Sequence, residues 1–346
     1  MKSIITGGAG FIGSNAAARA LRRGERVVVV DNLCRDGVQK NLDWLRTQGP
    51  LEFVRLDIRN AEELVRLFSE HRDADRVLHL AAQVAVTTSV TNPRDDFEMN
   101  ALGTFNVLEA VRRNAMTAPV LYSSTNKVYG EMTDMGIVEK NGQYSYGSLP
   151  YGVAEERNLD FHSPYGCSKG SADQYVIDYH RIYGLRTIVF RQSCIYGYRQ
   201  FGAEDQGWVA WFLIAAQLAR PITIYGDGKQ VRDILFIDDL LDAYDVAFSA
   251  GDRVVGKAYN IGGGPQNVLS LLELVAYIEK RQGRKLPYSF SGWRPGDQKV
   301  FVSDIRRAQR ELSWTPKIGC VAGLDRLYDW VAQNKNLFVA PAPVMA

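Results

Sequence analysis

The sequence predicts a doubly wound α/β fold with a second, smaller domain, and three observations support this prediction. Short apolar segments rich in β-branched residues alternate with segments of helical spacing through the first half of the chain. These apolar segments lack the polar alternation of a half-exposed strand, as expected of a parallel sheet that is covered on both faces. A cluster of glycines directly follows the first of them, and 346 residues are enough for about two domains.

The first half contains five predicted strands and three predicted helices. We expect strands at residues 2–6, 26–31, 51–54, 76–80 and 120–123, and helices at 15–23, 61–71 and 97–113. The last helix carries an apolar stripe formed by Leu102, Phe105, Leu108 and Val111. Strands and helices that alternate in this way predict a doubly wound parallel sheet of the Rossmann type.

The second half is less regular. We expect a strand at 186–190, helices at 238–249, 270–283 and 324–331, and a loop at 291–297, whereas residues 197–228 are rich in glycine and aromatic residues. The predicted division is a Rossmann domain of residues 1–190 plus about 230–262, and a smaller substrate domain of about 191–229 plus 263–338. The tail beyond Phe338, with Pro341 and Pro343, is expected to be loose.

Composition and charge exclude several classes of protein. Hydrophobic residues make up 46% and charged residues 23% of the chain, which excludes a disordered protein. The formal net charge of +2 gives no overall attraction to nucleic acid or to a membrane surface. No apolar run approaches the roughly 20 residues of a membrane span, and the four cysteines have no metal-binding spacing. We therefore expect a cytoplasmic protein without a metal site, a disulfide framework, a nucleic-acid partner or a membrane partner.

Three glycines lie between the first predicted strand and the helix that follows. Gly7, Gly10 and Gly13 let the backbone turn tightly and approach a pyrophosphate, whose charge the N-terminus of a helix favours. Asp31 ends the second strand, where a carboxylate accepts hydrogen bonds from the adenosine ribose and repels a 2′-phosphate. The pattern therefore predicts a site for NAD rather than NADP, although Arg35 is close enough in sequence to weaken this distinction.

Asp57 follows the third predicted strand and has two interpretations. With Ile58 it can frame the adenine of the cofactor, or it can cap the N-terminus of the next helix. The sequence favours neither interpretation over the other.

A hydroxyl-rich segment at residues 123–130 precedes a second motif that contains Tyr165 and Lys169. These two residues are four apart, so a helix places them on one face, where the ammonium group can lower the pKa of the phenol. A free phenol has a pKa near 10, which must fall by about 3 for a base that works near neutrality. A hydroxyl from Thr125 or Ser124 can complete the site. The arrangement predicts an enzyme that moves a proton together with a hydride.

Two arginines are candidates for binding a second diphosphate, that of a nucleotide-linked substrate. Arg232 and Arg294 both lie next to glycine- and aspartate-containing loops of the second half. Arginine forms paired hydrogen bonds with phosphate, but surface arginines are common, so the residues alone leave this assignment open.

These motifs resemble those of the extended short-chain dehydrogenase/reductase family over nearly the whole chain. Within that family, residues 122–130, 160–170 and 205–209 resemble the enzymes that invert carbon 2 of a CDP-linked hexose, and residues 228–233 and 297–302 fit the same group. The glycine motif and the Tyr-x-x-x-Lys spacing occur throughout the family. The run of Thr125, Asn126 and Lys127 is the more specific signature.

The resemblance implies an NAD-dependent epimerase, with Thr125, Tyr165 and Lys169 at the catalytic positions. It implies a nucleotide sugar as substrate, and we expect a homo-oligomer as the assembly. The residues that it implies for NAD are Gly7, Gly10, Phe11, Ile12, Gly13, Asp31, Asn32, Asp57, Ile58, Ala81, Ala82, Ser123, Tyr165 and Lys169. Those that it implies for the substrate are Ser124, Asn126, Lys127, Gln200, Arg232, Arg294 and Asp297.

Two departures from related enzymes narrow the expected reaction. Dehydratases of the same fold have an Asp-Glu pair where this chain has Asn126 and Lys127, so elimination of water is poorly supported. Many sugar epimerases hold the diphosphate with an Asn where this chain has Ser193 and Cys194, which leaves more of that binding to the two arginines.

Two alternatives to inversion at carbon 2 remain. One is epimerisation at carbon 4 of a UDP-sugar, which uses the same cofactor chemistry. The other is a non-catalytic dinucleotide-sensing protein on the same fold, which the intact catalytic residues argue against because a sensor needs no path for a proton.

Overall fold

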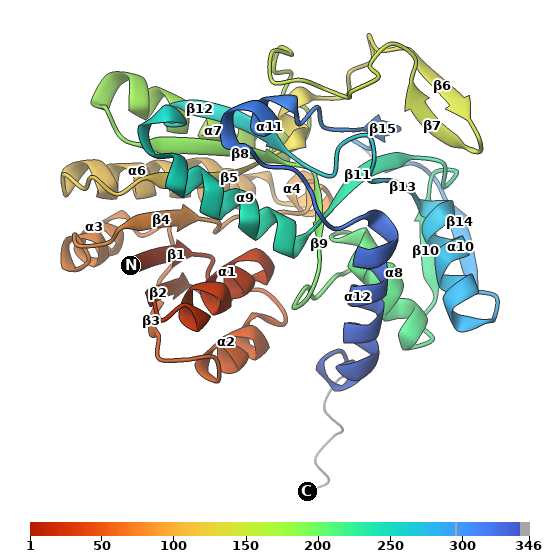
Figure 1. Cartoon of the computed structure of the whole chain (residues 1–346), viewed down its shortest axis with the longest axis horizontal. Coiled ribbons are helices and arrows are strands. Elements are labelled where there is room, and N and C mark those ends of the chain that lie inside the picture. The colour runs from red at the N-terminus through yellow and green to blue at the C-terminus, as the bar shows by residue number, and fades with distance from the viewer. Residues whose placement is uncertain (295, 340–346) are drawn as a thin grey trace, which may run out of the picture.

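The computed structural model describes residues 1–294 and 296–339, so the predicted loose tail, apart from Val339, lies outside the described residues. The described chain contains a seven-stranded parallel sheet in the order β12-β8-β5-β4-β1-β2-β3, seen at the left of Figure 1. The order reverses next to β1, which is the mark of a doubly wound sheet. The strands are β1 (Lys2–Thr6), β2 (Arg26–Asp31), β3 (Glu52–Arg55), β4 (Arg76–His79), β5 (Val120–Thr125), β8 (Thr187–Gln192) and β12 (Lys257–Ile261).

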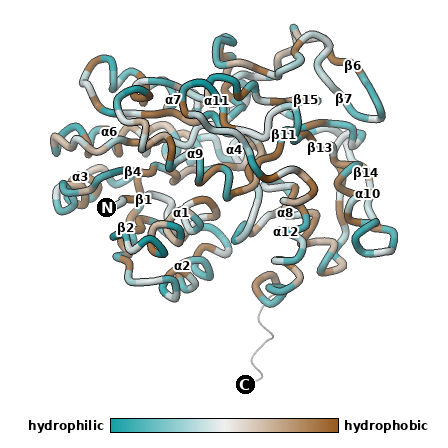
Figure 2. The backbone as a smooth tube through the Cα atoms, in the orientation of Figure 1, coloured by the Kyte–Doolittle hydropathy of each residue, from teal (hydrophilic) through white to brown (hydrophobic). Residues whose placement is uncertain are grey.

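Helices cover both faces of this sheet. On one face lie α1 (Phe11–Arg22), α2 (Val38–Arg46) and α9 (Ile237–Ala250). Buried residues of α1 and α9 and Leu45 of α2 belong to one large apolar core, whereas Val38 and Leu42 of α2 form a small cluster with Ala9. On the other face lie α3 (Ala61–Glu70), α6 (Gly103–Arg113) and α7 (Ser163–Tyr183), which bury a second core against the same strands. In Figure 2 hydrophobic segments run through the interior and hydrophilic segments mark the outer loops. The sheet is therefore apolar on both faces, as its strands predict.

The predicted strands of the sheet are confirmed with small shifts at their ends, but one predicted helix is wrong in its first part. Residues 97–113 do not form one α-helix, because a π-helical segment at Glu98–Leu102 separates α5 (Pro93–Phe97) from α6. The wider turn changes which side chains share a face. Leu102 therefore leaves the predicted apolar stripe and is 40% exposed, whereas Leu108 and Val111 are buried.

The second part of the chain forms smaller sheets beside the carboxyl ends of the central strands, at the right of Figure 1. Its strands are β9 (Cys194–Tyr196), β10 (Ile222–Tyr225), β11 (Val231–Phe236), β13 (Val268–Ser270), β14 (Tyr288–Ser291) and β15 (Val300–Phe301). Its helices are α8 (Trp208–Gln217), α10 (Leu271–Gln282), α11 (Arg306–Leu312) and α12 (Cys320–Gln333). A separate hairpin, β6 (Ile137–Lys140) and β7 (Gln143–Tyr146), lies between β5 and α7 in the chain and contacts β11 and β15. A short helix, α4 (Val86–Thr91), precedes α5.

The proposed division into two domains needs one change of boundary. The sequence predicts that the chain returns to the Rossmann domain near residue 230, but β11 pairs with β9, β13 and β15 of the smaller sheet. The return to the central sheet comes after β11, through α9 and β12. We therefore propose the boundary at the start of α9.

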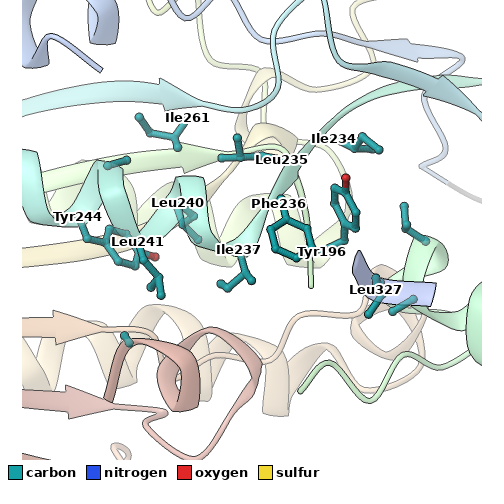
Figure 3. Packing of buried hydrophobic residues seen from close by; sticks show 14 of the residues in the cluster. Tyr196, Ile234, Leu235, Phe236, Ile237, Leu240, Leu241, Tyr244, Ile261 and Leu327 are labelled. Carbon is teal, nitrogen blue, oxygen red and sulfur yellow. The ribbon is translucent and has the colours of Figure 1, made fainter. Parts of the chain in front are cut away.

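A continuous apolar core joins the two parts of the molecule. Figure 3 shows Tyr196 of β9, Phe236 of β11 and Leu327 of α12 close to Ile237 and Leu240 of α9, and all five are buried. The rings of Tyr196 and Phe236 meet edge to face, with centroids 5.4 Å apart. Burying one such side chain contributes about 1.5–3 kcal/mol. This packing fixes the smaller part against the open end of the sheet, where the candidate site lies.

Candidate active site

A cavity of about 490 Å³ opens at the carboxyl ends of the central strands, where ligands bind in doubly wound sheets. Every residue that the sequence predicts for NAD, for the substrate or for catalysis lines this one cavity. The residues come from the turns after β1, β2, β3 and β4, from the end of β5, from α7, and from β11 and loops of the smaller part. The fold therefore brings together segments that lie far apart in the sequence.

The glycine turn after β1 has room for a pyrophosphate and none for side chains. Gly7 has a φ of 67°, and a Cβ on Gly13 would lie 2.2 Å from the carbonyl oxygen of Gly7. The helix α1 begins at Phe11, four residues earlier than the periodicity indicates, and Gly10 gives it no side-chain cap. The first N–H groups of α1 are therefore free to bind an anion. The turn fits the diphosphate of NAD.

Asp31 at the end of β2 organises the glycine turn as well as lining the cavity. Its carboxylate accepts hydrogen bonds from the backbone N–H of Ala9 at 3.1 Å and of Leu33 at 2.8 Å. Burial raises the pKa of Asp31, and these backbone hydrogen bonds oppose that rise. The guanidinium of Arg35, the residue that weakens the prediction of NAD over NADP, donates to Gln206 at 3.1 Å.

Asp57 does not cap α3, so that interpretation is wrong. The N-cap is Asn60, whose side chain accepts from the N–H of Glu63. Asp57 instead accepts hydrogen bonds from Arg59 and from the amide of Asn32, at 2.8–3.0 Å. The hydrogen bond from Arg59 is the main reason that the pKa of Asp57 falls to about 2. The pair of Asn32 and Asp57 lines the cofactor end of the cavity.

Tyr165 and Lys169 lie one turn apart in α7 and are both buried, at 8% and 3% exposure. The ammonium of Lys169 donates to the carbonyl of Ser123 at 2.5 Å and lies 4.3 Å from the centroid of the Tyr122 ring. Burial raises the pKa of Tyr165 to about 12 and lowers the pKa of Lys169 to about 7. In the protein alone burial sets the pKa of the phenol and Lys169 is not among the groups that lower it, which leaves a role for the positive nicotinamide.

Of the two hydroxyls that the sequence offers as partners for Tyr165, the structure selects Thr125. A hydrogen bond with Thr125 opposes the rise in the pKa of Tyr165. Successive side chains of a strand point to opposite sides, and Ser124 therefore turns away from this point. Its hydroxyl donates to Asp173 at 2.7 Å, so its predicted contact with the substrate does not rest on that hydroxyl.

Three cations line the opposite end of the cavity. Lys127 donates to the carbonyl of Gly296 at 2.8 Å, and its pKa falls to about 8, first because of burial and then because of repulsion by Arg232. Arg232 donates to the carbonyl of Val231, and Arg294 lies over the ring of Tyr225 at 3.6 Å. Within the described residues none of these three cations forms an ion pair. They can bind a diphosphate.

The other predicted substrate residues lie at the same end. Asn126 begins the turn that follows β5, and Asp297 raises the pKa of Lys127 while burial lowers it. Gln200 is buried at 3% exposure, and its side-chain oxygen has no hydrogen-bond partner among the described residues. A buried acceptor of this kind can take a hydrogen bond from a sugar hydroxyl.

The sequence analysis missed one wall of the cavity, because it predicted no elements within residues 197–228. Tyr225 ends β10 directly before Gly226, which has a φ of 86°, and this aromatic-glycine end of a strand is the signal that marks it. The loop before α8 crosses the cavity. Three consecutive side chains of this loop accept hydrogen bonds from three different walls of the cavity, at 2.9–3.1 Å. Glu204 accepts from Tyr225, Asp205 from Thr87 and Gln206 from Arg35.

The residues for the cofactor, for proton transfer and for the substrate follow one another along this cavity. The glycine turn and Asp31 form one end, the three cations form the other, and the buried Tyr165 and Lys169 lie between them. Residues 1–294 and 296–339 contain no group of His, Cys, Asp or Glu that could hold a metal ion. The fold and site define an NAD-dependent enzyme that couples proton transfer to the oxidation and reduction of an alcohol.

The chain belongs to the NAD dependent epimerase/dehydratase family, whose model matches residues 3–262. It is 46% identical to CDP-paratose 2-epimerase of Salmonella typhi, over 96% of this chain and 99% of that relative. Its structure is similar to UDP-glucose 4-epimerase of Thermotoga maritima, solved with UDP-glucose, with a TM-score of 0.82 and 29% identity over 97% of this chain and 100% of the other.

A second solved structure extends this comparison to an enzyme with bound cofactor. UDP-glucuronic acid 4-epimerase of Bacillus cereus, solved with UDP-glucuronic acid and NAD, has a TM-score of 0.81 and 29% identity, over 96% of this chain and 99% of the other. The resemblance found in the sequence is therefore confirmed, as are the fold, the cofactor NAD and the enzyme class. The protein is an NAD-dependent enzyme of the nucleotide-sugar epimerase and dehydratase class.

Proposed function

We propose that the protein inverts carbon 2 of a CDP-linked hexose, in a reaction of the CDP-paratose to CDP-tyvelose type. The observation that carries this proposal is the 46% identity to CDP-paratose 2-epimerase over nearly the whole of both chains. The residues after Thr125 support it, because Asn126 and Lys127 offer no carboxylic acid to protonate a departing hydroxyl. Epimerisation, which loses no atom, needs no such acid.

The residues of the glycine turn, Asp31 and the pair of Asn32 and Asp57 would hold NAD. When bound, NAD supplies the acceptor and later the donor of the hydride at carbon 2. Tyr165 takes the proton of the sugar hydroxyl as the ketone forms and returns it when the ketone is reduced. Thr125 holds the same oxygen in place by a hydrogen bond, and Lys169 supplies positive charge beside the phenol.

Inversion also requires the ketone to turn its other face to the cofactor without leaving. Lys127, Arg232 and Arg294 would hold the diphosphate at the far end of the cavity, so the sugar can rotate about its link to the nucleotide. The loop of Glu204, Asp205 and Gln206 spans the cavity and hinders escape of the ketone. These two features suit an epimerase better than an enzyme that releases its oxidised product.

The test is incubation with a CDP-hexose that carries deuterium at carbon 2, with NMR analysis of the product. We expect deuterium to stay at carbon 2 with inverted configuration, and no reduced cofactor to accumulate. Loss of deuterium to solvent would instead show proton abstraction beside a ketone. Accumulation of reduced cofactor in proportion to substrate would show a simple dehydrogenase.

A second candidate is a UDP-sugar 4-epimerase, which the structural similarity to UDP-glucose 4-epimerase of Thermotoga maritima favours. Both reactions use the same residues for cofactor and proton. A matched incubation with UDP-glucose separates them, because inversion at carbon 4 of that sugar would support the second candidate and refute the first.

We also propose that the protein is a homo-oligomer. Apolar side chains are exposed on α5 and α7, among them Phe97 at the end of α5 at 56%, Tyr175 near the middle of α7 at 49% and Ile182 at 65%. Exposed apolar side chains on two helices that pack together can form an interaction surface. Light scattering coupled to size-exclusion chromatography tests this, and a mass of one chain would refute it.

A further inference from the structure

A buried ion pair lies directly behind the catalytic residues, and the proposed mechanism does not use it. The side chain of Asp173 in α7 is 0% exposed and that of Arg191 in β8 is 5% exposed. The guanidinium donates to both carboxylate oxygens, at 3.0 and 2.9 Å. The hydroxyl of Ser124 donates to the same carboxylate at 2.7 Å. We refer to Ser124, Asp173 and Arg191 as the buried cluster.

The buried cluster connects the three elements that carry the active site. Asp173 lies one turn beyond Lys169 on α7, and Ser124 precedes Thr125 on β5. Arg191 is the direct neighbour of Ser124 across the β5–β8 pair. The cluster therefore fixes the end of β5 against the catalytic turn of α7.

Stability alone does not account for this arrangement. Removing two charges from water costs more than their attraction returns in many proteins, and apolar residues of similar size often stabilise a core equally well. A buried ion pair beside the catalytic residues therefore calls for another role. Its position beside Lys169 suggests that the role is electrostatic.

Several charged or titratable groups face Lys169 from the elements around it. Asp173 on the same helix and Asp96 from α5 both favour its charged form, and Asp173 has the larger effect. His79 of β4 stays neutral, because burial lowers its pKa to about 3. Asp96 accepts hydrogen bonds from Ser168, Gln83 and Asn100, and burial raises its pKa.

We propose that Asp173, held in place by Ser124 and Arg191, is a positioning residue that supplies the fixed negative charge which keeps Lys169 protonated beside Tyr165. Arg191 orients the carboxylate and balances part of its charge, and Ser124 ties it to the strand that carries Thr125. None of the three touches the substrate in this role. The inference rests on the proposed function for its effect on turnover, but the charge of Lys169 can be measured without any substrate.

The test measures the titration of Lys169 by NMR in protein labelled at lysine Cε, with Lys169→Met to assign the signal. In Asp173→Asn the pKa of Lys169 is expected to fall by about 1 or more. The pH above which turnover declines should fall with it, while the KM for the sugar nucleotide stays within about twofold, since the residue does not bind substrate. The double variant Asp173→Asn/Arg191→Gln removes both charges and leaves neither unpaired, so it tests the same shift if the single variant does not fold.

The matched control is Glu25→Gln, which breaks another buried ion pair at the opposite end of the sheet. The side chains of Glu25 and Arg76 are 6% and 9% exposed, and Nη2 of Arg76 lies 2.5 Å from Oε2 of Glu25. This variant should lose thermal stability without moving either the titration of Lys169 or the pH profile. An unchanged titration of Lys169 in both Asp173 variants would overturn the proposal, as would an equal shift in Glu25→Gln. If the titration shifts but no CDP-hexose is converted by the unmodified protein, the proposed function fails and the inference stands.

Discussion

Substitution of Gly13 by alanine should abolish tight binding of NAD while leaving the rest of the fold intact. A Cβ at this position would lie 2.2 Å from the carbonyl oxygen of Gly7 and 2.7 Å from the Cα of Gly8. Both are backbone atoms, so no side chain can move aside. The turn must withdraw by about 1.2 Å to reach an ordinary van der Waals distance.

The size of the effect follows from that displacement. An N–H···O hydrogen bond of about 2.9 Å does not survive a shift of about 1 Å. A hydrogen bond to a charged group contributes about 1.5–3 kcal/mol, so each bond to the pyrophosphate that is lost should raise the Kd for NAD roughly 10- to 150-fold. If two such hydrogen bonds are lost, the two factors in Kd multiply.

The assay is isothermal titration of NAD into the purified variant after removal of any bound cofactor. The matched control is Gly136→Ala, because a Cβ there meets no atom within 4 Å and Gly136 does not have a positive φ. This control should bind NAD like the unmodified protein. If Gly13→Ala also binds NAD with an unchanged Kd and melts at the same temperature, the close approach of the glycine turn to the cofactor is refuted.

Four further predictions follow from the site. Tyr165→Phe keeps the ring and removes the acid and base, so turnover should fall by about 10²-fold or more with NAD binding unchanged, and near-normal turnover would identify another base. Asp31→Ala should relax the preference for NAD over NADP and also weaken binding of both, because it removes the hydrogen bond from Ala9 that holds the glycine turn and the one from Leu33 that holds the loop after β2; tighter binding of NADP by the unmodified protein would contradict this role. The KM for the sugar nucleotide should rise as the pH passes about 8, because the pKa of Lys127 is lowered to about 8 and its positive charge is lost above that pH; a KM that is independent of pH in Lys127→Met identifies the group. Arg294→Ala should raise the same KM by a factor that corresponds to about 1.5–3 kcal/mol and leave NAD bound, whereas loss of NAD alone would reverse the assignment.

Local patterns in the sequence were sufficient for six of the seven strands of the central sheet and for the two main motifs, but not for β12 (Lys257–Ile261), for which no strand was predicted. Strands buried on both faces, the glycine turn and the spacing of Tyr165 and Lys169 each depend on residues that are close together in the chain. Strand alternation also explains why Thr125 rather than Ser124 reaches Tyr165. By contrast, the pair of Asp173 and Arg191 joins a helix to a strand and leaves no local pattern.

The other differences between the sequence predictions and the structure also depend on the backbone path or on contacts between distant parts of the chain. Asn60 and Asp57 are both good helix caps, and only the backbone path after β3 decides between them. The position of β11 in the smaller sheet depends on pairing with β9, β13 and β15, which come from three separate parts of the chain. The π-helical turn before α6 places Leu102 in solvent although its spacing is that of a buried stripe.

The burial of Tyr165 suits a reaction in which one group must act first as a base and then as an acid. Burial raises the pKa of Tyr165 to about 12, so the phenol holds its proton firmly unless positive charge lies nearby. Beside the oxidised, positive nicotinamide and a charged Lys169, Tyr165 can take a proton from the sugar hydroxyl. After the hydride has left the sugar, the high pKa of Tyr165 would hold the proton on the phenol until the ketone, having turned its other face, takes the proton back. The base of a simple dehydrogenase passes this proton on to solvent, whereas an epimerase must return it to a ketone that never leaves.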